Sequence, residues 1–152
     1  MGRRAATLAR HGLPPGCLTV EVTETAVFGG GHALAAVAAL SAQGIAIALD
    51  DFGTGHSSLG LLRTCPVDTI KVDKSFVDGL GGTPQQEAIV TALAGIAATM
   101  QLDLVAEGVE TAEQAQRLVE LGYPHAQGFH FARPMPADSI DAMVEQGSRQ
   151  AA

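Results

Sequence analysis

The stretch at residues 45–59 constrains the fold of this chain more than any other part of the sequence. It begins with an apolar run at 45–49, of the length and composition that a buried parallel strand requires. The run ends in two adjacent carboxylates, Asp50 and Asp51, and Gly-Thr-Gly follows at 53–55. Because side chains alternate along a strand, we expect Asp50 to lie on the face opposite the large apolar side chains, with Asp51 just beyond the strand.

Two acids at a strand end, before a flexible glycine turn, are typical of a divalent-metal site. An ordinary turn that carries two solvated acids gives the same pattern. Both interpretations of residues 45–59 stay open at this point.

The composition favours one folded domain. The chain has 152 residues and a hydrophobic fraction of 47%, which is enough for a core. No apolar run approaches the roughly 20 residues of a membrane span. The basic start, Met1 to Arg4, is not followed by the apolar segment of a signal peptide. We therefore expect a cytoplasmic protein without a membrane span.

Charge and aromatic content narrow the possible partners. A net charge of −7, one Tyr and no Trp argue against a surface for DNA or RNA. The two cysteines, Cys17 and Cys65, are too few for a disulfide framework and lack the spacing of a metal site. The acidic balance does not argue against a metal-dependent enzyme, because the metal supplies positive charge.

Strand-like and helix-like segments alternate along the chain. Expected strands lie at 18–23, 45–49, 68–73, 102–106 and 126–131. Expected helices lie at 32–43, 57–63, 85–100, 111–121 and 137–145. The spacing of Ile89, Leu93, Ile96 and Met100 by 4, 3 and 4 residues supports the third of these helices and places these apolar side chains on one stripe. This order predicts an α/β fold with a parallel sheet, a single domain over 1–152 and frayed ends at 1–6 and 147–152.

Polar residues gather at or just past the carboxyl ends of these strands. They are Glu21, Glu24, Asp50, Asp51, Lys71, Glu107, Glu110 and Gln127. Active sites of (β/α) barrels are built at that end of the strands. A doubly wound sheet also binds ligands there, but the sequence contains neither G-x-G-x-x-G nor a Walker A motif.

Several of these residues also have a simpler interpretation. Lys71 could be a sheet-edge lysine that extends its charge into solvent. Glu107 and Glu110 could be acids that favour the start of a helix, and Gln127 could cap a turn.

Five motifs, taken together and in order, point to one family. They are Glu21-Val22-Thr23-Glu24-Thr25, Asp50-Asp51-Phe52-Gly53-Thr54-Gly55, Ile70-Lys71-Val72-Asp73, Ala106-Glu107-Gly108-Val109-Glu110-Thr111 and Gln127-Gly128-Phe129. This set resembles EAL domains, bacterial phosphodiesterases specific for cyclic di-GMP, and the resemblance extends from Thr7 to Pro136. It implies a TIM-type (β/α)₈ barrel in a bacterial cytoplasmic protein that hydrolyses cyclic di-GMP to linear pGpG.

The resemblance also implies roles for the acids and the lysine. Glu21, Asp50 and Asp51 are expected to ligate metal, with Asp50 bridging two ions. Lys71 is expected to orient or help deprotonate the attacking water, and Glu107 to be a carboxylate at the metal site. The implied cofactor is a pair of Mg²⁺ or Mn²⁺ ions, and oxygen ligands suit these hard cations.

Three further residues receive supporting roles from the resemblance. Gln127 is expected to contact the water and the phosphate. Glu24 is expected to hold the loop at 51–59 in shape, and Glu110 to support the site from behind the metal ligands. The sequence assigns no residue to binding of the nucleotide bases.

The sequence departs from the EAL pattern in two respects. It lacks the Glu-Ala-Leu motif and the Asn-bearing strand that follows it in the family, both of which donate metal ligands. A (β/α)₈ barrel typically takes about 250 residues, so we expect the C-terminal portion of an EAL domain, with about five of eight strands and open edges at 18–23 and 126–131. The smaller departure is His56, where the family usually has Tyr.

Three functional hypotheses follow from this pattern. The first is an EAL-type phosphodiesterase that is weak or inactive without further N-terminal sequence. The second is a non-catalytic module that binds cyclic di-GMP or another protein and oligomerises, or takes a partner chain, through its open edges. The third is a homo-oligomer that completes itself and retains weak hydrolysis.

Overall fold

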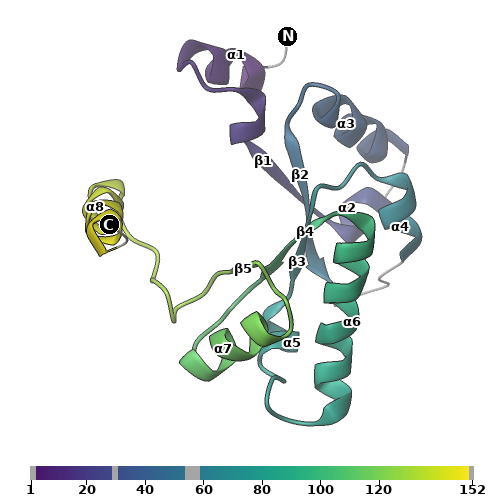
Figure 1. Ribbon diagram of the computed structural model, residues 1–152. Coiled ribbons are helices and arrows are strands. Elements are labelled where there is room, and N and C mark those ends of the chain that lie inside the picture. The colour runs from purple at the N-terminus through teal and green to yellow at the C-terminus, as the bar shows by residue number, and fades with distance from the viewer. Residues whose placement is uncertain (1–2, 29–30, 54–58, 151–152) are drawn as a thin grey trace.

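A computed structural model describes residues 3–28, 31–53 and 59–150 (Figure 1). Its centre is a parallel sheet of five strands in the order β1-β2-β3-β4-β5. The strands are β1 Thr19–Thr23, β2 Ala46–Phe52, β3 Thr69–Val72, β4 Asp103–Ala106 and β5 His125–Ala126.

Each strand pairs in parallel with the next strand along the chain. A doubly wound sheet reverses its strand order at a switch point, and the described strands show no such reversal. Strictly sequential order is the arrangement of a barrel wall. The predicted α/β fold is confirmed, and β1 and β5 are the outer strands, as expected.

Helices precede, connect and follow the strands. They are α1 Arg3–Arg10, the 3₁₀ helix η1 Pro15–Cys17, α2 Glu24–Phe28, α3 Gly31–Ser41, α4 Leu59–Thr64, α5 Lys74–Val77, α6 Pro84–Met100, α7 Ala112–Glu120 and α8 Ala137–Gln150. A capping box of Thr111 and Gln114 opens α7. Helix α8 lies apart from the sheet, at the end of an extended segment (Figure 1). His56 and the expected helix start at Ser57 lie outside the described residues.

The core face of α6 overlaps the predicted apolar stripe only in part. Leu93 is buried and Ile96 packs against the core, whereas Ile89 is 49% exposed and Met100 is 38% exposed. Val90, outside the stripe, is fully buried. Because α6 is apolar on more than one side, periodicity alone does not decide which residues face the core.

Strand β2 is longer than expected and contains a bulge. It continues through Phe52, and its register with β3 shifts between Leu49 and Phe52. Asp51 has a φ of 53°, in the left-handed region, so it lies within the strand at the bulge rather than beyond it. This correction has a consequence for the site, because a bulge changes the direction of neighbouring side chains.

Strand β5 is shorter than the expected strand at 126–131. Beyond Ala126 the chain turns, and the amides of Phe131 and Ala132 both donate to the Gly128 carbonyl, at 3.1 and 3.2 Å. Gly128 also passes so close to the Val109 backbone that a Cβ at this position would clash. The segment at 126–131 therefore leaves the sheet in a turn that packs against the segment after β4.

Tyr123 links the approach to β5 with α6, because its buried hydroxyl donates to the Val90 carbonyl at 2.9 Å. We expect Tyr123→Phe to lower the free energy of unfolding by about 1 kcal/mol, the net contribution of a typical hydrogen bond. Urea denaturation of the two proteins measures this difference. Equal midpoints would show that the bond does not stabilise the fold.

Candidate functional site

One polar residue from the end of each strand reaches a common site. These residues are Glu21 in β1, Asp50 in β2, Lys71 in β3, Glu107 directly after β4 and Gln127 directly after β5. In a parallel sheet the carboxyl ends of all strands meet at one edge, so the topology alone brings these side chains together.

Lys71 is the centre of this group. Its Nζ atom lies 2.7 Å from Glu107 Oε1, 2.8 Å from Glu21 Oε1 and 3.0 Å from Asp50 Oδ1. The Lys71 side chain is only 9% exposed. The alternative of a solvent-directed edge lysine is therefore wrong, because this ammonium lies among carboxylates contributed by three parts of the sheet.

Two opposing effects act on the pKa of Lys71. Burial lowers the pKa, because it disfavours the charged form. The hydrogen bonds to Glu107, Glu21 and Asp50 more than offset this effect and raise the pKa above its usual value. Lys71 is thus a cation at neutral pH in this arrangement.

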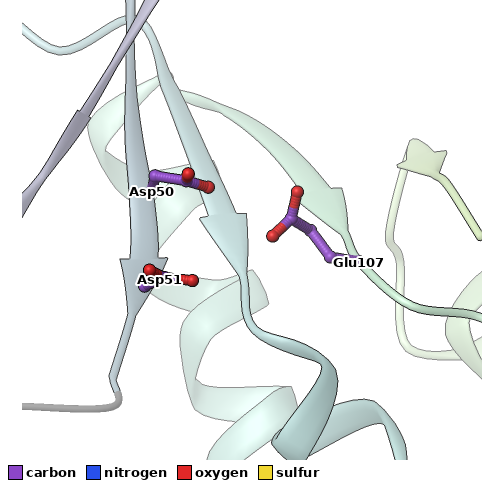
Figure 2. A group of neighbouring side chains, drawn as sticks. All are labelled: Asp50, Asp51 and Glu107. Carbon is purple, nitrogen blue, oxygen red and sulfur yellow. The ribbon is translucent and has the colours of Figure 1, made fainter.

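Asp50, Asp51 and Glu107 form a candidate metal centre. Each offers one carboxylate oxygen, and these oxygens lie within 4.8 Å of one another. Figure 2 shows both aspartates extending from β2 toward Glu107, which points back at them from the end of β4. Adjacent side chains of a regular strand point to opposite faces, so the bulge at Asp51 explains how both acids reach the same site. Oxygen donors alone suit Mg²⁺ or Mn²⁺ rather than zinc.

Gln127 and Glu107 are directly linked. Gln127 Nε2 donates to Glu107 Oε1 at 2.6 Å. Neither Glu107 nor Glu110 lies in a helix, because α7 begins at Ala112 after its N-cap Thr111. The structure therefore does not support the simpler interpretations, in which Gln127 caps a turn and Glu107 and Glu110 begin a helix.

The remaining two predicted residues differ in their surroundings. Glu24, the first residue of α2, is 6% exposed, and its Oε1 atom has no hydrogen-bond partner within the described parts of the chain. Its expected role concerns the loop at 51–59, of which residues 54–58 lie outside the description. Glu110 contacts Lys74 at 2.9 Å.

Lys74 and the contact of Gln114 with the Val77 carbonyl were not predicted from the sequence. Lys74 follows Lys71 by three residues and begins α5, yet no motif marks it as functional. Gln114 is recognisable as a capping residue, but its bond to the Val77 carbonyl depends on how α5 and α7 pack.

A cavity of about 730 Å³ adjoins the site on the side of β5 and α8. Lys74, Glu110 and Gln127 line the end near the metal centre, and Phe129 and Arg133 line the outer part. The Arg133 guanidinium lies 4.5 Å from the centre of the Phe129 ring. Such a cation–aromatic pair offers a flat surface beside the charged site.

Within the described residues, no helix combines the length and the apolar character needed to cross a membrane.

Comparison with known proteins relates the chain to one family. The model of the EAL domain family matches residues 2–134. The MucR phosphodiesterase of Pseudomonas aeruginosa, solved as a complex with cyclic di-GMP, is 42% identical with a TM-score of 0.81, over 90% of this chain and 56% of that chain. The EAL domain of Mycobacterium smegmatis DcpA is 39% identical with a TM-score of 0.86, over 95% of this chain and 65% of that chain.

A third similar structure contains a metal. Klebsiella pneumoniae BlrP1, solved with manganese and cyclic di-GMP, is 38% identical with a TM-score of 0.79, over 85% of this chain and 33% of that chain. The chain spans 17% to 23% of the length of the curated relatives that it matches. The five parallel strands correspond to part of a TIM-type barrel. By the extent of the family match and by its fold, this chain belongs to the EAL domain family.

Proposed function

We propose that this chain carries the carboxyl-terminal part of a site for metal-dependent hydrolysis of cyclic di-GMP to linear pGpG. One observation supports this proposal most strongly: oxygens of Asp50, Asp51 and Glu107 gather within 4.8 Å of one another beside a buried lysine. The substrate is proposed from relatives, since MucR is described as a cyclic di-GMP phosphodiesterase and was solved with that ligand.

The proposed cofactor is Mg²⁺ or Mn²⁺, held by Asp50, Asp51 and Glu107, with Glu21 as a further ligand. The manganese in BlrP1 supports a divalent ion in this family. A divalent ion held by these residues would help to activate a water near neutral pH and would offset charge on the phosphate.

The other residues are proposed to orient the reactants. Lys71 places a cation beside the carboxylates, where it can orient the phosphate or the attacking water. Gln127 holds Glu107 through a 2.6 Å hydrogen bond, which fixes the direction of that carboxylate. Glu24 and Glu110 are proposed to position the loop at 51–59 and the segment after β4. The cavity at Phe129 and Arg133 can accommodate a flat base next to the phosphate.

We expect weak or absent hydrolysis by this chain alone. The Glu-Ala-Leu motif and the Asn-bearing strand of EAL domains are missing from the sequence, and each would add a metal ligand. The described sheet is also open, with β1 and β5 outermost.

A second candidate is a non-catalytic module that binds cyclic di-GMP or another protein. Its supporting observation is the apolar surface on the β5 side, where large side chains are exposed. They are Phe129, Phe131, Ile140, Met143 and Val144. Together with the outer strands, this surface favours association with a second copy or a partner chain.

Replacing Asp50 with Asn tests the metal centre. In Mn²⁺ and cyclic di-GMP, we expect the wild-type unfolding free energy to rise by about 2.7 kcal/mol at a hundredfold excess over Kd. Asp50→Asn should abolish most of this rise, because it removes a charged ligand. Thermal unfolding scans with and without both ligands measure the effect.

Asp103→Asn is the matched control, since Asp103 is exposed at the opposite end of β4. An unchanged rise in Asp50→Asn would contradict the metal site. Stabilisation by cyclic di-GMP that needs no Mn²⁺ would favour the non-catalytic module.

Replacing Lys71 with Met tests the balance of charge at the site. In a chelator, we expect the unfolding free energy to fall by roughly 1–3 kcal/mol at neutral pH, as for other charged hydrogen bonds. Since the pKa of Lys71 is raised in the folded protein, this contribution is complete at neutral pH and is lost only as the pH rises through the folded value.

Mn²⁺ should recover most of that stability, because the ion supplies positive charge to the same carboxylates. Urea denaturation in chelator and in Mn²⁺ measures both effects. Arg63→Met removes an exposed cation from α4 and serves as the control. A loss of equal size in chelator and in Mn²⁺ would contradict a shared carboxylate site.

A further inference from the structure

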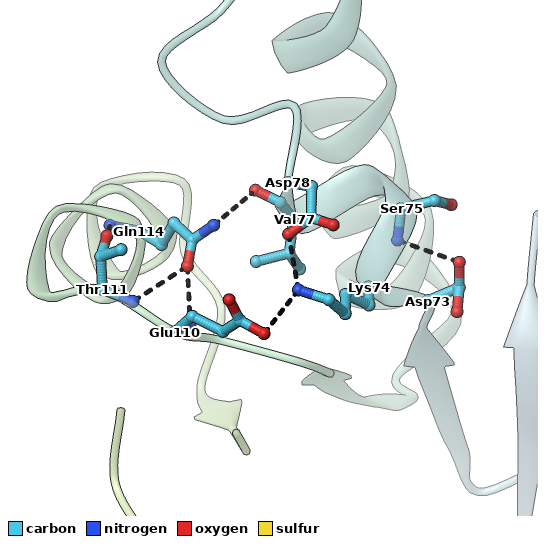
Figure 3. Close-up of polar contacts among 8 residues, drawn as sticks. All are labelled: Asp73, Lys74, Ser75, Val77, Asp78, Glu110, Thr111 and Gln114. Atoms are coloured by element: carbon cyan, nitrogen blue, oxygen red, sulfur yellow. Dashed lines mark hydrogen bonds and ion pairs between the residues drawn. The ribbon is translucent and has the colours of Figure 1, made fainter. Parts of the chain in front are cut away.

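A second lysine, Lys74, lines the cavity that adjoins the candidate metal centre. Lys74 Nζ lies 2.9 Å from Glu110 Oε1 and 2.9 Å from Asp78 Oδ1 (Figure 3). Lys74 belongs to α5, which follows β3, and Glu110 belongs to the segment that follows β4. The ion pair therefore connects the segments that follow two neighbouring strands.

The segment after β4 also packs on the aliphatic part of Lys74. Gly108 has a φ of 70°, and a Cβ at this position would lie 2.6 Å from Lys74 Cβ. Only a glycine fits such a close approach with that backbone conformation. The residue next to Glu107 is thus in direct contact with the Lys74 side chain.

Gln114 adds a neutral link between the same two segments. Its Oε1 accepts from the amides of Glu110 and Thr111, at 2.8 and 3.1 Å. Its Nε2 donates to the Val77 carbonyl in α5 at 3.4 Å. Figure 3 shows this amide between α7, α5 and the segment that carries Glu110.

Two ion pairs hold the segment that carries Glu107, one on each side of Gly108. Lys71 contacts the Glu107 carboxylate, and Lys74 contacts Glu110, three residues further on. Lys71 lies in β3, and Lys74 begins α5 two residues after that strand ends, so the two ion pairs join neighbouring elements to the segment after β4 on either side of Gly108. Backbone hydrogen bonds of Glu107 and Val109 also hold this segment, and the Lys74–Glu110 pair adds a side-chain link beyond Gly108.

We propose that Lys74 is a positioning residue for Glu107: its ion pair with Glu110 and its packing on Gly108 hold the Glu107 carboxylate at the metal centre. This inference rests on the proposed metal site. At 43% and 50% side-chain exposure, the Lys74–Glu110 pair adds little to global stability, so its effect is expected to be local. Small displacements of a ligand are costly at a metal site, because binding depends on ligand geometry.

Lys74→Met provides the test, because methionine retains an aliphatic stem against Gly108 and removes the charge. We expect the Kd for Mn²⁺, measured by electron paramagnetic resonance of the free ion, to rise about tenfold. The melting temperature should stay close to that of the wild type. Lys74→Arg should restore the affinity, since it can still pair with Glu110.

Asp78→Asn is the matched control. It removes the other partner of Lys74 and leaves the pair with Glu110, so Mn²⁺ affinity should not change. Unchanged affinity in Lys74→Met, or an equal loss in Asp78→Asn, would overturn the proposal.

A second readout does not depend on metal. The amides of Glu107 and Val109 donate to the carbonyls of Val72 and Gln127, each at 3.0 Å, and report the order of this segment. Amide hydrogen exchange should be faster at these two positions in Lys74→Met but not in Asp78→Asn. If the wild-type chain binds no Mn²⁺, the proposed metal site fails, and exchange alone decides the role of Lys74. Unchanged exchange would then overturn that role.

Discussion

The buried ammonium of Lys71 holds the carboxyl edge of the sheet together. Glu21, Asp50 and Glu107 come from different strands, and their negative charges would repel one another without a cation between them. Lys71 satisfies all three with contacts of 2.7–3.0 Å and remains charged because of them. The arrangement keeps the acids close together in the absence of metal. It thereby prepares the oxygen ligands that a divalent ion requires.

The geometry of the site depends on two local irregularities of the backbone. The bulge at Asp51 turns a second aspartate toward the site, which a regular strand would direct to the other face. Gly108 lets the segment after β4 pass against Lys74, next to Glu107. Regular strands bring the five side chains to one edge, and these irregular positions set their directions.

Much of the fold and the site could be predicted from the sequence. The alternating segments indicated a parallel sheet, and the acids that follow them indicated which end carries the chemistry. The bulge at Asp51 and the turn after Ala126 could not be predicted, because both depend on pairing with a neighbouring segment. The contact of Lys74 with Glu110 could not be predicted for the same reason, because the two residues lie 36 positions apart in the sequence. The residues of α6 that face the core could not be predicted either, because more than one face of that helix is apolar and packing decides between them.

The central claim is that Asp50, Asp51 and Glu107 form one metal centre within this chain. Crystals of the chain soaked in Mn²⁺, measured at the manganese absorption edge, test it most directly. We expect an anomalous peak bounded by carboxylate oxygens of these three residues, with the Lys71 ammonium displaced from at least one of its present partners. A manganese peak elsewhere, or no peak at this edge of the sheet while Lys71 keeps all three contacts, would contradict it.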